Sequence, residues 1–182
     1  MDYQPDQILE YWFSDEMKKH WFFSTAEIDK EIKNKFEQFW IIAKEGTLSD
    51  WENTATGCLA LCIILDQLPL NMFRGEAKSF SSEQKAVAIS KHAISKKYDE
   101  ILPGDKLAFL FMPLMHSENM SDQDLAVAMF EKYDMKENAR FAKHHRDIVN
   151  KYGRFPHRNK ALSRTSSKEE IEYLNSDEAF KG

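Results

Sequence analysis

Hydrophobic residues recur along most of the chain at the three- and four-residue spacing of an amphipathic helix. The clearest stripe consists of Ile28, Ile32, Phe36, Phe39, Trp40 and Ala43. Gly46 follows this stripe, and glycine takes the left-handed conformation that ends many helices. No run of useful length alternates between apolar and polar residues, which is the pattern of a half-buried strand. The pattern predicts an all-α fold.

Residues that favour helix N-termini stand before most of the apolar stripes. We expect helices to begin at Pro5 with Asp6, Ser24 with Glu27, Ser49 with Glu52, Ser81 or Ser82, Asp105, Ser121 with Asp124, and Ser166 or Ser167. The helix from Ser49 is predicted to end at Pro69 and the helix from Asp105 around Pro113, because proline disrupts a helix interior. A long last helix is predicted from about Lys136 to Tyr152, with Gly153 as its end.

These signals give about seven to nine helices joined by short turns, which favours antiparallel helix pairs over one long bundle. The 182 residues suit one domain, 1–182, with a single core. The longest apolar stretch, 58–65, is far shorter than the roughly 20 residues of a membrane span, and we expect a cytoplasmic protein without a membrane partner. Cys58 and Cys62 are expected to be small buried hydrophobic residues.

Positive charge is concentrated near the C-terminal end of the chain. The segment 140–164 holds eight Lys or Arg residues and one acid, Asp147, whereas the whole chain has a net charge of −5. Such asymmetry argues for a surface that faces an anion. Within this segment, residues 153–159 gather two guanidinium groups, an imidazole and an amide around Pro156. We predict a polar site here.

Three polar segments are expected to form one pocket, at 66–74, 116–118 and 154–159. The predicted ligand-binding residues are Arg74, Arg154, His157, Arg158, Asn159 and Arg164, because guanidinium forks bind carboxylates and phosphates. The predicted supporting residues, which hold the arginines or satisfy backbone groups, are Asp66, Gln67, Asn71 and Asp147. Satisfaction of the backbone around Pro69 competes with direct ligand contact as the role of Asp66, Gln67 and Asn71.

Three functions stay open. The first is binding of an anionic small molecule or an acidic peptide terminus in this pocket. The second is an enzyme in which His116 or His145 acts as general acid or base beside Glu118, on a phosphate or carboxylate substrate. The third is a protein-interaction scaffold whose arginines pair internally with acids such as Asp66, Glu118 and Asp147.

Other classes of function lack their sequence signals. Six scattered glycines supply neither of the glycine-rich loops that bind nucleotides. The acidic net charge and the absence of a reader motif argue against nucleic acid as a partner. His144 and His145 are adjacent, and no His-x-x-x-His pair occurs, so we expect no metal and no cofactor.

Several motifs together resemble one known family. The phrases LDQLPLNMFRG, FMPLMHSE, HRDIVNKYGRFPHRN and LSRTSSKEE, in this order, with ILEYWF and HWFF near the start, are similar to bacterial domain of unknown function 924. The resemblance covers nearly the whole chain and implies a fold similar to tetratricopeptide-like α-α superhelices. It implies no established activity.

The resemblance also implies which polar positions belong to the family pattern. They are Asp66, Gln67, Asn71, Arg74, His116, Ser117, Glu118, His145, Gly153, Arg154, Pro156, His157, Arg158, Asn159 and Arg164. Two positions depart from the pattern. Leu70 stands where an arginine is usual, which removes a cation from the first motif, and Ser163 stands where a glycine is usual, in the turn before Arg164.

Overall fold

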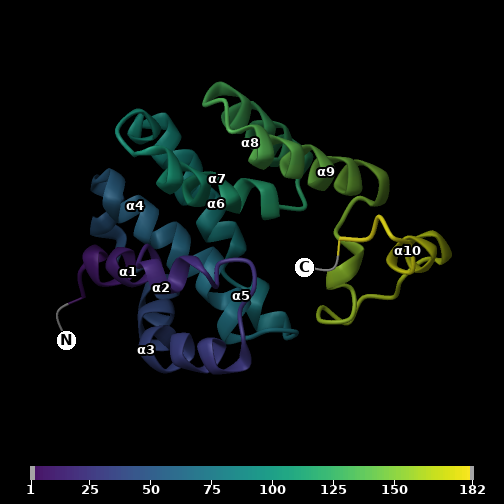
Figure 1. Ribbon diagram of the computed structural model, residues 1–182, viewed down its shortest axis with the longest axis horizontal. Coiled ribbons are helices and arrows are strands. Elements are labelled where there is room, and N and C mark those ends of the chain that lie inside the picture. Colours follow the sequence, from purple (N-terminus) through teal and green to yellow (C-terminus); the bar gives the residue numbers. More distant parts are fainter. Residues whose placement is uncertain (1–2, 181–182) are drawn as a thin grey trace. The chain divides into compact units, whose positions relative to one another are not determined.

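The computed structural model describes residues 3–180, and all regular structure in this part of the chain is helical (Figure 1). The α-helices are α1 Pro5–Trp12, α2 Asp15–Lys18, α3 Ala26–Glu45, α4 Ala55–Cys62, α5 Leu68–Met72, α6 Glu83–Ser95, α7 Gly104–His116, α8 Met120–Lys132, α9 Lys136–Tyr152 and α10 Lys168–Leu174. The short 3₁₀ helices are η1 Ser49–Asn53, η3 Ala77–Phe80, η4 Tyr98–Glu100 and η5 Pro156–Arg158, and η2 Ile63–Gln67 is a π-helix. The prediction of an all-α fold is confirmed.

The described residues form two compact units. Unit 1 takes the residues up to Arg74 together with Lys78–Pro113, and unit 2 takes Gly75–Ala77 and the residues from Leu114 on. Whether the chain folds as one domain stays a prediction.

Two predicted helix starts in unit 1 are wrong by a few residues. Thr25, not Ser24, caps α3, because the Ser24 hydroxyl donates instead to Asp29 (2.8 Å). Residues Ser49–Asn53 form the 3₁₀ helix η1, and α4 begins only after Thr54, whose hydroxyl accepts from the Gly57 amide (3.0 Å). A Cβ at Gly57 would lie 2.0 Å from the carbonyl oxygen of Trp51, so the close approach of η1 requires glycine there.

Pro69 does not end its helix as predicted, since α4, η2 and α5 follow one another without a break from Ala55 to Met72. Pro69 has no N–H to donate to the carbonyl of Leu65, four residues earlier. The Ser82 hydroxyl donates to that carbonyl instead (2.6 Å) and accepts from the Trp40 indole (2.9 Å). The wider π turn before Pro69 therefore replaces the expected break.

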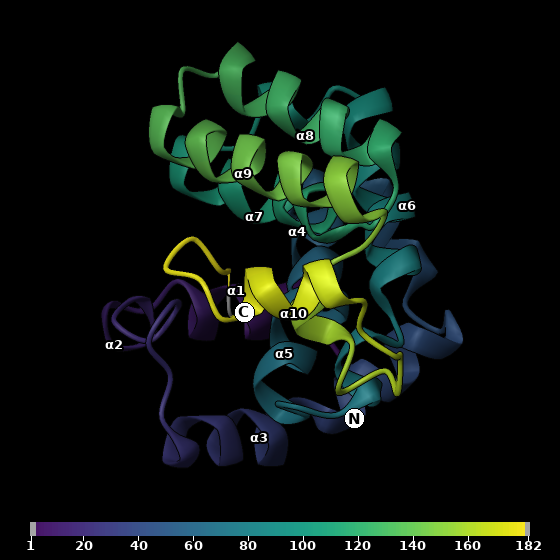
Figure 2. The same ribbon diagram turned by 90° about the vertical axis from the view of Figure 1, so that its right-hand side faces the viewer.

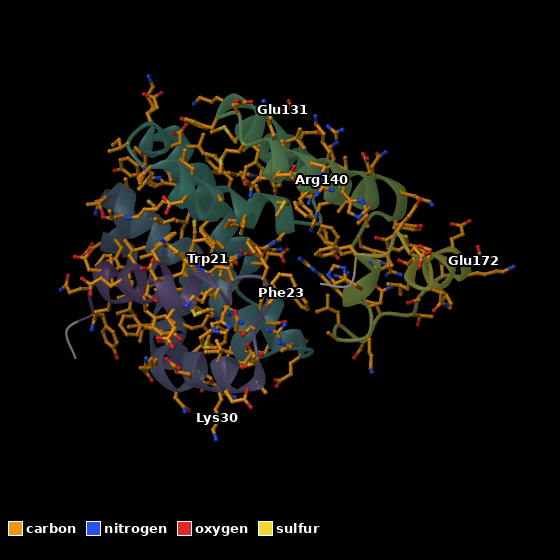
Figure 3. All side chains as sticks on the ribbon, in the orientation of Figure 1. Trp21, Phe23, Lys30, Glu131, Arg140 and Glu172 are labelled. Carbon is orange, nitrogen blue, oxygen red and sulfur yellow. The ribbon has the colours of Figure 1, made fainter. Side chains whose placement is uncertain are left out.

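The stretch Ala55–Met72 lies in the core of unit 1. Its mean hydropathy, 1.4, and its 18 residues match a membrane-spanning helix by composition, but 78% of it is buried within the structure, as in the core helix of a soluble protein. It packs against α1 and α6 through α4 and against α3 through α5. Trp21 and Phe109 make an edge contact in the same unit (4.6 Å between ring centroids). Figure 3 shows Lys30 projecting from the outer side of α3.

Helix α7 continues three residues beyond Pro113, where we expected it to halt. Two side chains give partners to carbonyl groups of its last turns. Ser90 donates to the Leu110 carbonyl (2.6 Å), and Gln123 donates to the Met115 carbonyl (2.7 Å). Pro113 removes the helical donor of the Phe109 carbonyl, four residues earlier, and the two hydrogen bonds support neighbouring carbonyls of the same turns.

Unit 2 is built on the packed pair α8 and α9, which lie side by side in both ribbon views (Figures 1 and 2). Asn119, not Ser121, caps α8, because its side-chain oxygen accepts from the Ser121 amide (2.9 Å). Helix α9 spans the predicted residues and ends at Gly153, with φ +71°. Its inner residues Ile148 and Val149 pack with Phe155.

Candidate functional site

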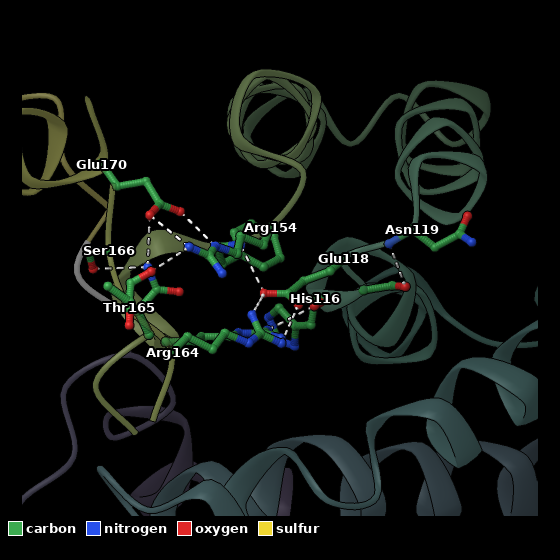
Figure 4. A network of polar contacts seen from close by, with 12 residues as sticks. His116, Glu118, Asn119, Arg154, Arg164, Thr165, Ser166 and Glu170 are labelled. Carbon is green, nitrogen blue, oxygen red and sulfur yellow. Dashed lines mark hydrogen bonds and ion pairs between the residues drawn. The ribbon is translucent and has the colours of Figure 1, made fainter. Parts of the chain in front are cut away.

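Glu118 joins the segment between α7 and α8 to two later parts of unit 2. One carboxylate oxygen accepts from the Phe155 amide (2.9 Å), and Arg164 donates to both oxygens (2.8 Å each), as Figure 4 shows for the ion pair. Burial opposes ionisation, but the hydrogen bonds from Arg164 and Phe155 hold the pKa of Glu118 below its usual value. The Glu118 carboxylate is therefore charged, and both of its oxygens accept hydrogen bonds from groups of the same chain.

Glu170 makes a second clamp, at the first turn of α10. Arg154 donates through Nε and Nη2 to its two oxygens (2.7 and 2.9 Å), as Figure 4 shows. Asn159 Nδ2 (3.2 Å) and the Ser167 amide (2.7 Å) donate to the same carboxylate. Hydrogen bonds, chiefly from Arg154, lower the pKa of Glu170 to about 2. Its side chain is only 3% exposed, so the pair is closed to solvent on the carboxylate side.

Arg158 is more deeply buried than Arg154 and Arg164. The residue is 5% exposed, its guanidinium lies over the Phe155 ring (4.7 Å to the centroid), and Nη2 donates to the His116 carbonyl (2.8 Å). Its charge also contributes to the low pKa of Glu118. Arg158 thus helps to hold the short helix η5 against the end of α7 in unit 2.

The remaining cations of α9 lie on the surface of unit 2 beside acids. Arg140 pairs with Glu137 (3.1 Å), and Lys143 pairs with Glu131 (2.6 Å). Figure 3 shows Glu131 and Arg140 on the outer side of the α8 and α9 pair. Asp147, predicted to support the site, lies 3.9 Å from Arg146 with its side chain 73% exposed. The positive charge of 140–164 is therefore partly balanced by acids. Some are near in sequence, such as Glu137 and Asp147, and others are distant, such as Glu118 and Glu170.

His145 is buried on the inner side of α9 and is 3% exposed. Its Nδ1 lies 2.9 Å from the Phe141 carbonyl and donates to it, which leaves a lone pair on Nε2. Nε2 makes no hydrogen bond to any group of residues 3–180. Burial, followed by the nearby His116 ring (6.4 Å between centroids), lowers the pKa of His145 to about 3.

His157 lies in the same region of unit 2. Its ring contacts Phe155 (5.6 Å) and Phe180 (5.0 Å), and the Phe180 ring also contacts His145 (4.4 Å). Burial, followed by the neighbouring Arg158 charge, lowers the pKa of His157 to about 4. We call His145, His157, Phe155 and Phe180 the histidine–aromatic cluster.

The first polar motif lies in unit 1. Arg74 donates through Nε and Nη2 to Asp29 (2.7 and 3.1 Å), and Asn71 donates to the same carboxylate (2.8 Å). Burial opposes ionisation, but hydrogen bonds from Arg74, Asn71 and Ser24 keep the pKa of Asp29 below its usual value. Asp66 and Gln67 are buried side by side in η2. Both residues lie within a continuous helical stretch, so there is no helix break whose backbone groups they could satisfy.

The predicted site residues therefore fall into two groups, one in each unit. Unit 1 holds Asp66, Gln67, Asn71 and Arg74, and unit 2 holds His116, Glu118, His145, Asp147, Arg154, His157, Arg158, Asn159 and Arg164. A single pocket made by all three segments stays a prediction. Among residues 3–180, no three His, Cys, Asp or Glu side chains are arranged to hold a metal ion.

Two surface hollows contain none of the predicted site residues. One, of about 390 Å³, lies at the turn between α8 and α9 and is lined by Asp134, Lys136 and Arg140 among others. The other, of about 170 Å³, lies in unit 1 and is lined by Tyr11, His20 and Glu31 among others. Neither hollow locates the predicted site.

Three residues of the two motif regions were missed in the sequence. Glu170 stands three residues after Ser167 and forms the capping box whose spacing was visible, but its burial against Arg154 was not. Asp29 and Phe180 gave no signal, because their partners are distant in sequence. Asp29 lies 45 residues from Arg74. Phe180 lies 35 residues from His145 and 23 residues from His157.

The two departures from the family pattern have different surroundings. Ser163 has φ +53°, the left-handed conformation that glycine adopts most easily, and the next amide, that of Arg164, donates to the Asn159 carbonyl (2.8 Å). Leu70 lies in α5 and is partly exposed.

The comparisons with known proteins agree on one family. The family model described as bacterial protein of unknown function, DUF924, matches residues 8–178. A solved structure of a protein of unknown function from Agrobacterium tumefaciens, ATU0120, is 31% identical, with a TM-score of 0.89. The match covers 94% of this chain and 96% of that chain. No curated protein matches the chain.

Proposed function

We propose that this chain, which belongs to the DUF924 family of bacterial proteins of unknown function, acts as a helical protein-interaction scaffold. In this proposal its arginine motif, Arg154, Arg158 and Arg164, holds segments of the same chain together. One observation carries this proposal. The guanidinium groups of Arg154 and Arg164 each span both oxygens of a carboxylate of the same chain, Glu170 and Glu118. The two clamps hold the segment after α9, which has little regular structure of its own.

The two clamps weigh against a ligand role for the same arginines. A phosphate or carboxylate bound through both nitrogens of Arg154 would have to displace Glu170 from bonds of 2.7 and 2.9 Å. The displaced carboxylate is buried, and an unpaired buried charge is costly. Glu170, already hydrogen-bonded to Arg154, therefore competes with any external anion for the guanidinium group.

His145 gives limited support to an enzyme. A general base works best when its pKa lies near the working pH, whereas the pKa of His145 is about 3. Glu118, which was predicted to act beside His116 or His145, is fixed as a charged carboxylate by Arg164 and Phe155. Neither group is poised to exchange a proton near neutral pH.

Binding of an anionic small molecule or acidic peptide terminus is the second candidate, and the same clamps favour it in one respect. Glu118 and Glu170 are already bound as such a carboxylate would be, so the arginine forks have the geometry for this chemistry. On this alternative, an external carboxylate replaces an internal one when the C-terminal segment opens.

Thermal melts of the full chain separate the two candidates. The wild type, Arg158→Ala and the control Lys160→Ala, an exposed cation two residues later, would be melted with phosphate, succinate and chloride at equal ionic strength. The scaffold proposal predicts no anion-specific stabilisation of the wild type. It also predicts a loss of about 3 to 5 kcal/mol in Arg158→Ala and within about 0.5 kcal/mol in Lys160→Ala.

The opposite pattern would support the ligand site. Saturable stabilisation of the wild type by phosphate or succinate, abolished in Arg158→Ala at a cost of about 1 kcal/mol or less, would overturn the scaffold proposal.

A further inference from the structure

The ring of Phe180 fills a place whose other walls are partly polar. It makes edge contacts with His145 (4.4 Å) and His157 (5.0 Å) and packs against the apolar group of Ile148, Val149 and Phe155. Phe180 belongs to the tail after α10, where its amide donates to the Tyr173 hydroxyl (2.9 Å). The occupant of this place is thus an aromatic side chain on a piece of chain without regular secondary structure.

The histidine–aromatic cluster has one hydrogen-bonding atom that Phe180 cannot serve. Nε2 of His145 is buried, and because Nδ1 donates to the Phe141 carbonyl, Nε2 carries a lone pair that accepts a hydrogen bond. No donor among residues 3–180 reaches it. A buried acceptor without a donor costs free energy, so an occupant that supplied an O–H group would bind better than a hydrocarbon ring.

The histidine keeps this acceptor at neutral pH. With a pKa of about 3, His145 stays neutral, and a neutral imidazole offers a lone pair where an imidazolium offers only donors. The Phe180 ring centroid lies 4.4 Å from the imidazole centroid with the ring planes 60° apart, so a ring in this place is in direct contact with the imidazole. A phenol has the shape of the present occupant and carries the missing donor.

We propose that the place held by Phe180 is a binding site for a tyrosine side chain of a partner polypeptide, and that the C-terminal tail occupies it in the absence of that partner. His145 accepts from the phenol hydroxyl, and His157 and Phe155 contact the ring. That the tyrosine belongs to a partner polypeptide rests on the proposed scaffold function. That the site prefers a phenol ring does not rest on it.

Competition with the tail sets the expected affinities. A ligand that binds only when Phe180 has left the site is weakened by the fraction of molecules with the tail in place. Phe180 is partly exposed, so Phe180→Ala removes the competitor and frees the space that its ring occupies. The variant should therefore bind phenol more tightly than the wild type does, by at least about tenfold.

The test uses the full chain as wild type, Phe180→Ala and Phe180→Ala with His145→Phe. Binding of phenol and of toluene, its counterpart without a donor, would be measured by titration calorimetry and by thermal shift. Phe180→Ala should melt below the wild type, recover with phenol, and prefer phenol to toluene by about tenfold. In the double variant, which keeps an aromatic ring at 145 but has no acceptor, that preference should disappear.

A second probe tests the polypeptide source. N-acetyl-tyrosinamide should bind Phe180→Ala more tightly than N-acetyl-phenylalaninamide does. If phenol binds and the tyrosine amide does not, the partner polypeptide is excluded while the phenol site stands. This result is independent of the melts with phosphate and succinate, which test the role of the arginine motif.

Three results would overturn the proposal. Equal melting temperatures of the wild type and Phe180→Ala would mean that Phe180 does not hold the site. Equal binding of phenol and toluene to Phe180→Ala would mean that Nε2 does not select a donor. Where Phe180→Ala fails to fold, Tyr173→Phe, which removes the hydrogen bond to the Phe180 amide, provides the test: phenol affinity equal to that of the wild type would contradict competition by the tail.

Discussion

Arg154 and Glu170 form a closed two-point ion pair in which Nε and Nη2 of the guanidinium lie 2.7 and 2.9 Å from the two carboxylate oxygens. The pair joins the turn after α9 to the first turn of α10. Asn159 and the Ser167 amide donate to the same carboxylate, so four donors depend on one acid. Glu170 thus joins Arg154, Asn159 and Ser167 through one carboxylate.

Glu170→Gln should destabilise the protein by about 1 to 3 kcal/mol, because a neutral amide cannot satisfy all four donors and leaves Arg154 without its counter-charge. Glu169→Gln is a matched control, since Glu169 lies in the same first turn but is exposed. It should stay within about 0.5 kcal/mol of the wild type. Urea unfolding of both variants measures the difference, and equal effects would count against the clamp.

Ser163→Gly should stabilise the protein by about 0.5 to 1 kcal/mol, because serine at φ +53° bears a steric cost that glycine avoids. Ala161→Gly, two residues earlier and not in the left-handed region, should instead lose about 0.5 to 1 kcal/mol. Melting temperatures of the two variants test the contrast. A loss of stability in both would show that the turn before Arg164 is not strained by serine.

Stability should begin to fall when the pH drops below about 6.5. In the unfolded chain His145 and His157 take up protons near pH 6.5, but in the folded chain only near pH 3 and 4. The unfolded state therefore binds more protons in this range, and the free energy of unfolding decreases by up to about 1.4 kcal/mol per pH unit for each histidine. Their stabilising effect is complete above pH 6.5 and is lost by about pH 3.

The carboxylates act in the same direction but at lower pH. Glu118 and Glu170 have lowered pKa values, so their contribution is present above about pH 4.5 and declines as the pH falls below it. Urea unfolding between pH 7.5 and 5 isolates the histidines. His157→Gln should show a smaller slope there than the wild type, and an unchanged slope would contradict the burial of His157.

The helices could largely be predicted because their signals are local. Gly46 and Gly153 end α3 and α9 as their left-handed conformations require, and Ser167 caps α10. Some errors arose from local competition, as where Asn119 rather than Ser121 caps α8, and one arose where a distant partner changes a local rule. Ser82 satisfies the Leu65 carbonyl that Pro69 leaves open, and the two residues are 17 apart in sequence.

The candidate site could be located only in part. Residue types and charge marked the segment 153–159, and Glu118 was expected as a partner for its arginines. The sequence could not show which acid each arginine meets, because Arg154 selects Glu170 and Arg164 selects Glu118 through tertiary packing. For the same reason the sequence could not show that acids outside the segment pair with Arg154 and Arg164, and the surface that faces an anion stays a prediction.

If the arginine motif holds the C-terminal segment in place, Glu118 and Arg164 stabilise the fold jointly, and a double-mutant cycle on the two residues measures this. Glu118→Gln, Arg164→Gln and the double variant would be compared by urea unfolding, with the exposed pair Arg140 and Glu137 as reference (side chains 66% and 79% exposed). We predict a coupling energy of about 1 kcal/mol or more for the Glu118 pair and about 0.5 kcal/mol or less for the reference. A Glu118 to Arg164 coupling no larger than that of the exposed pair would contradict the account.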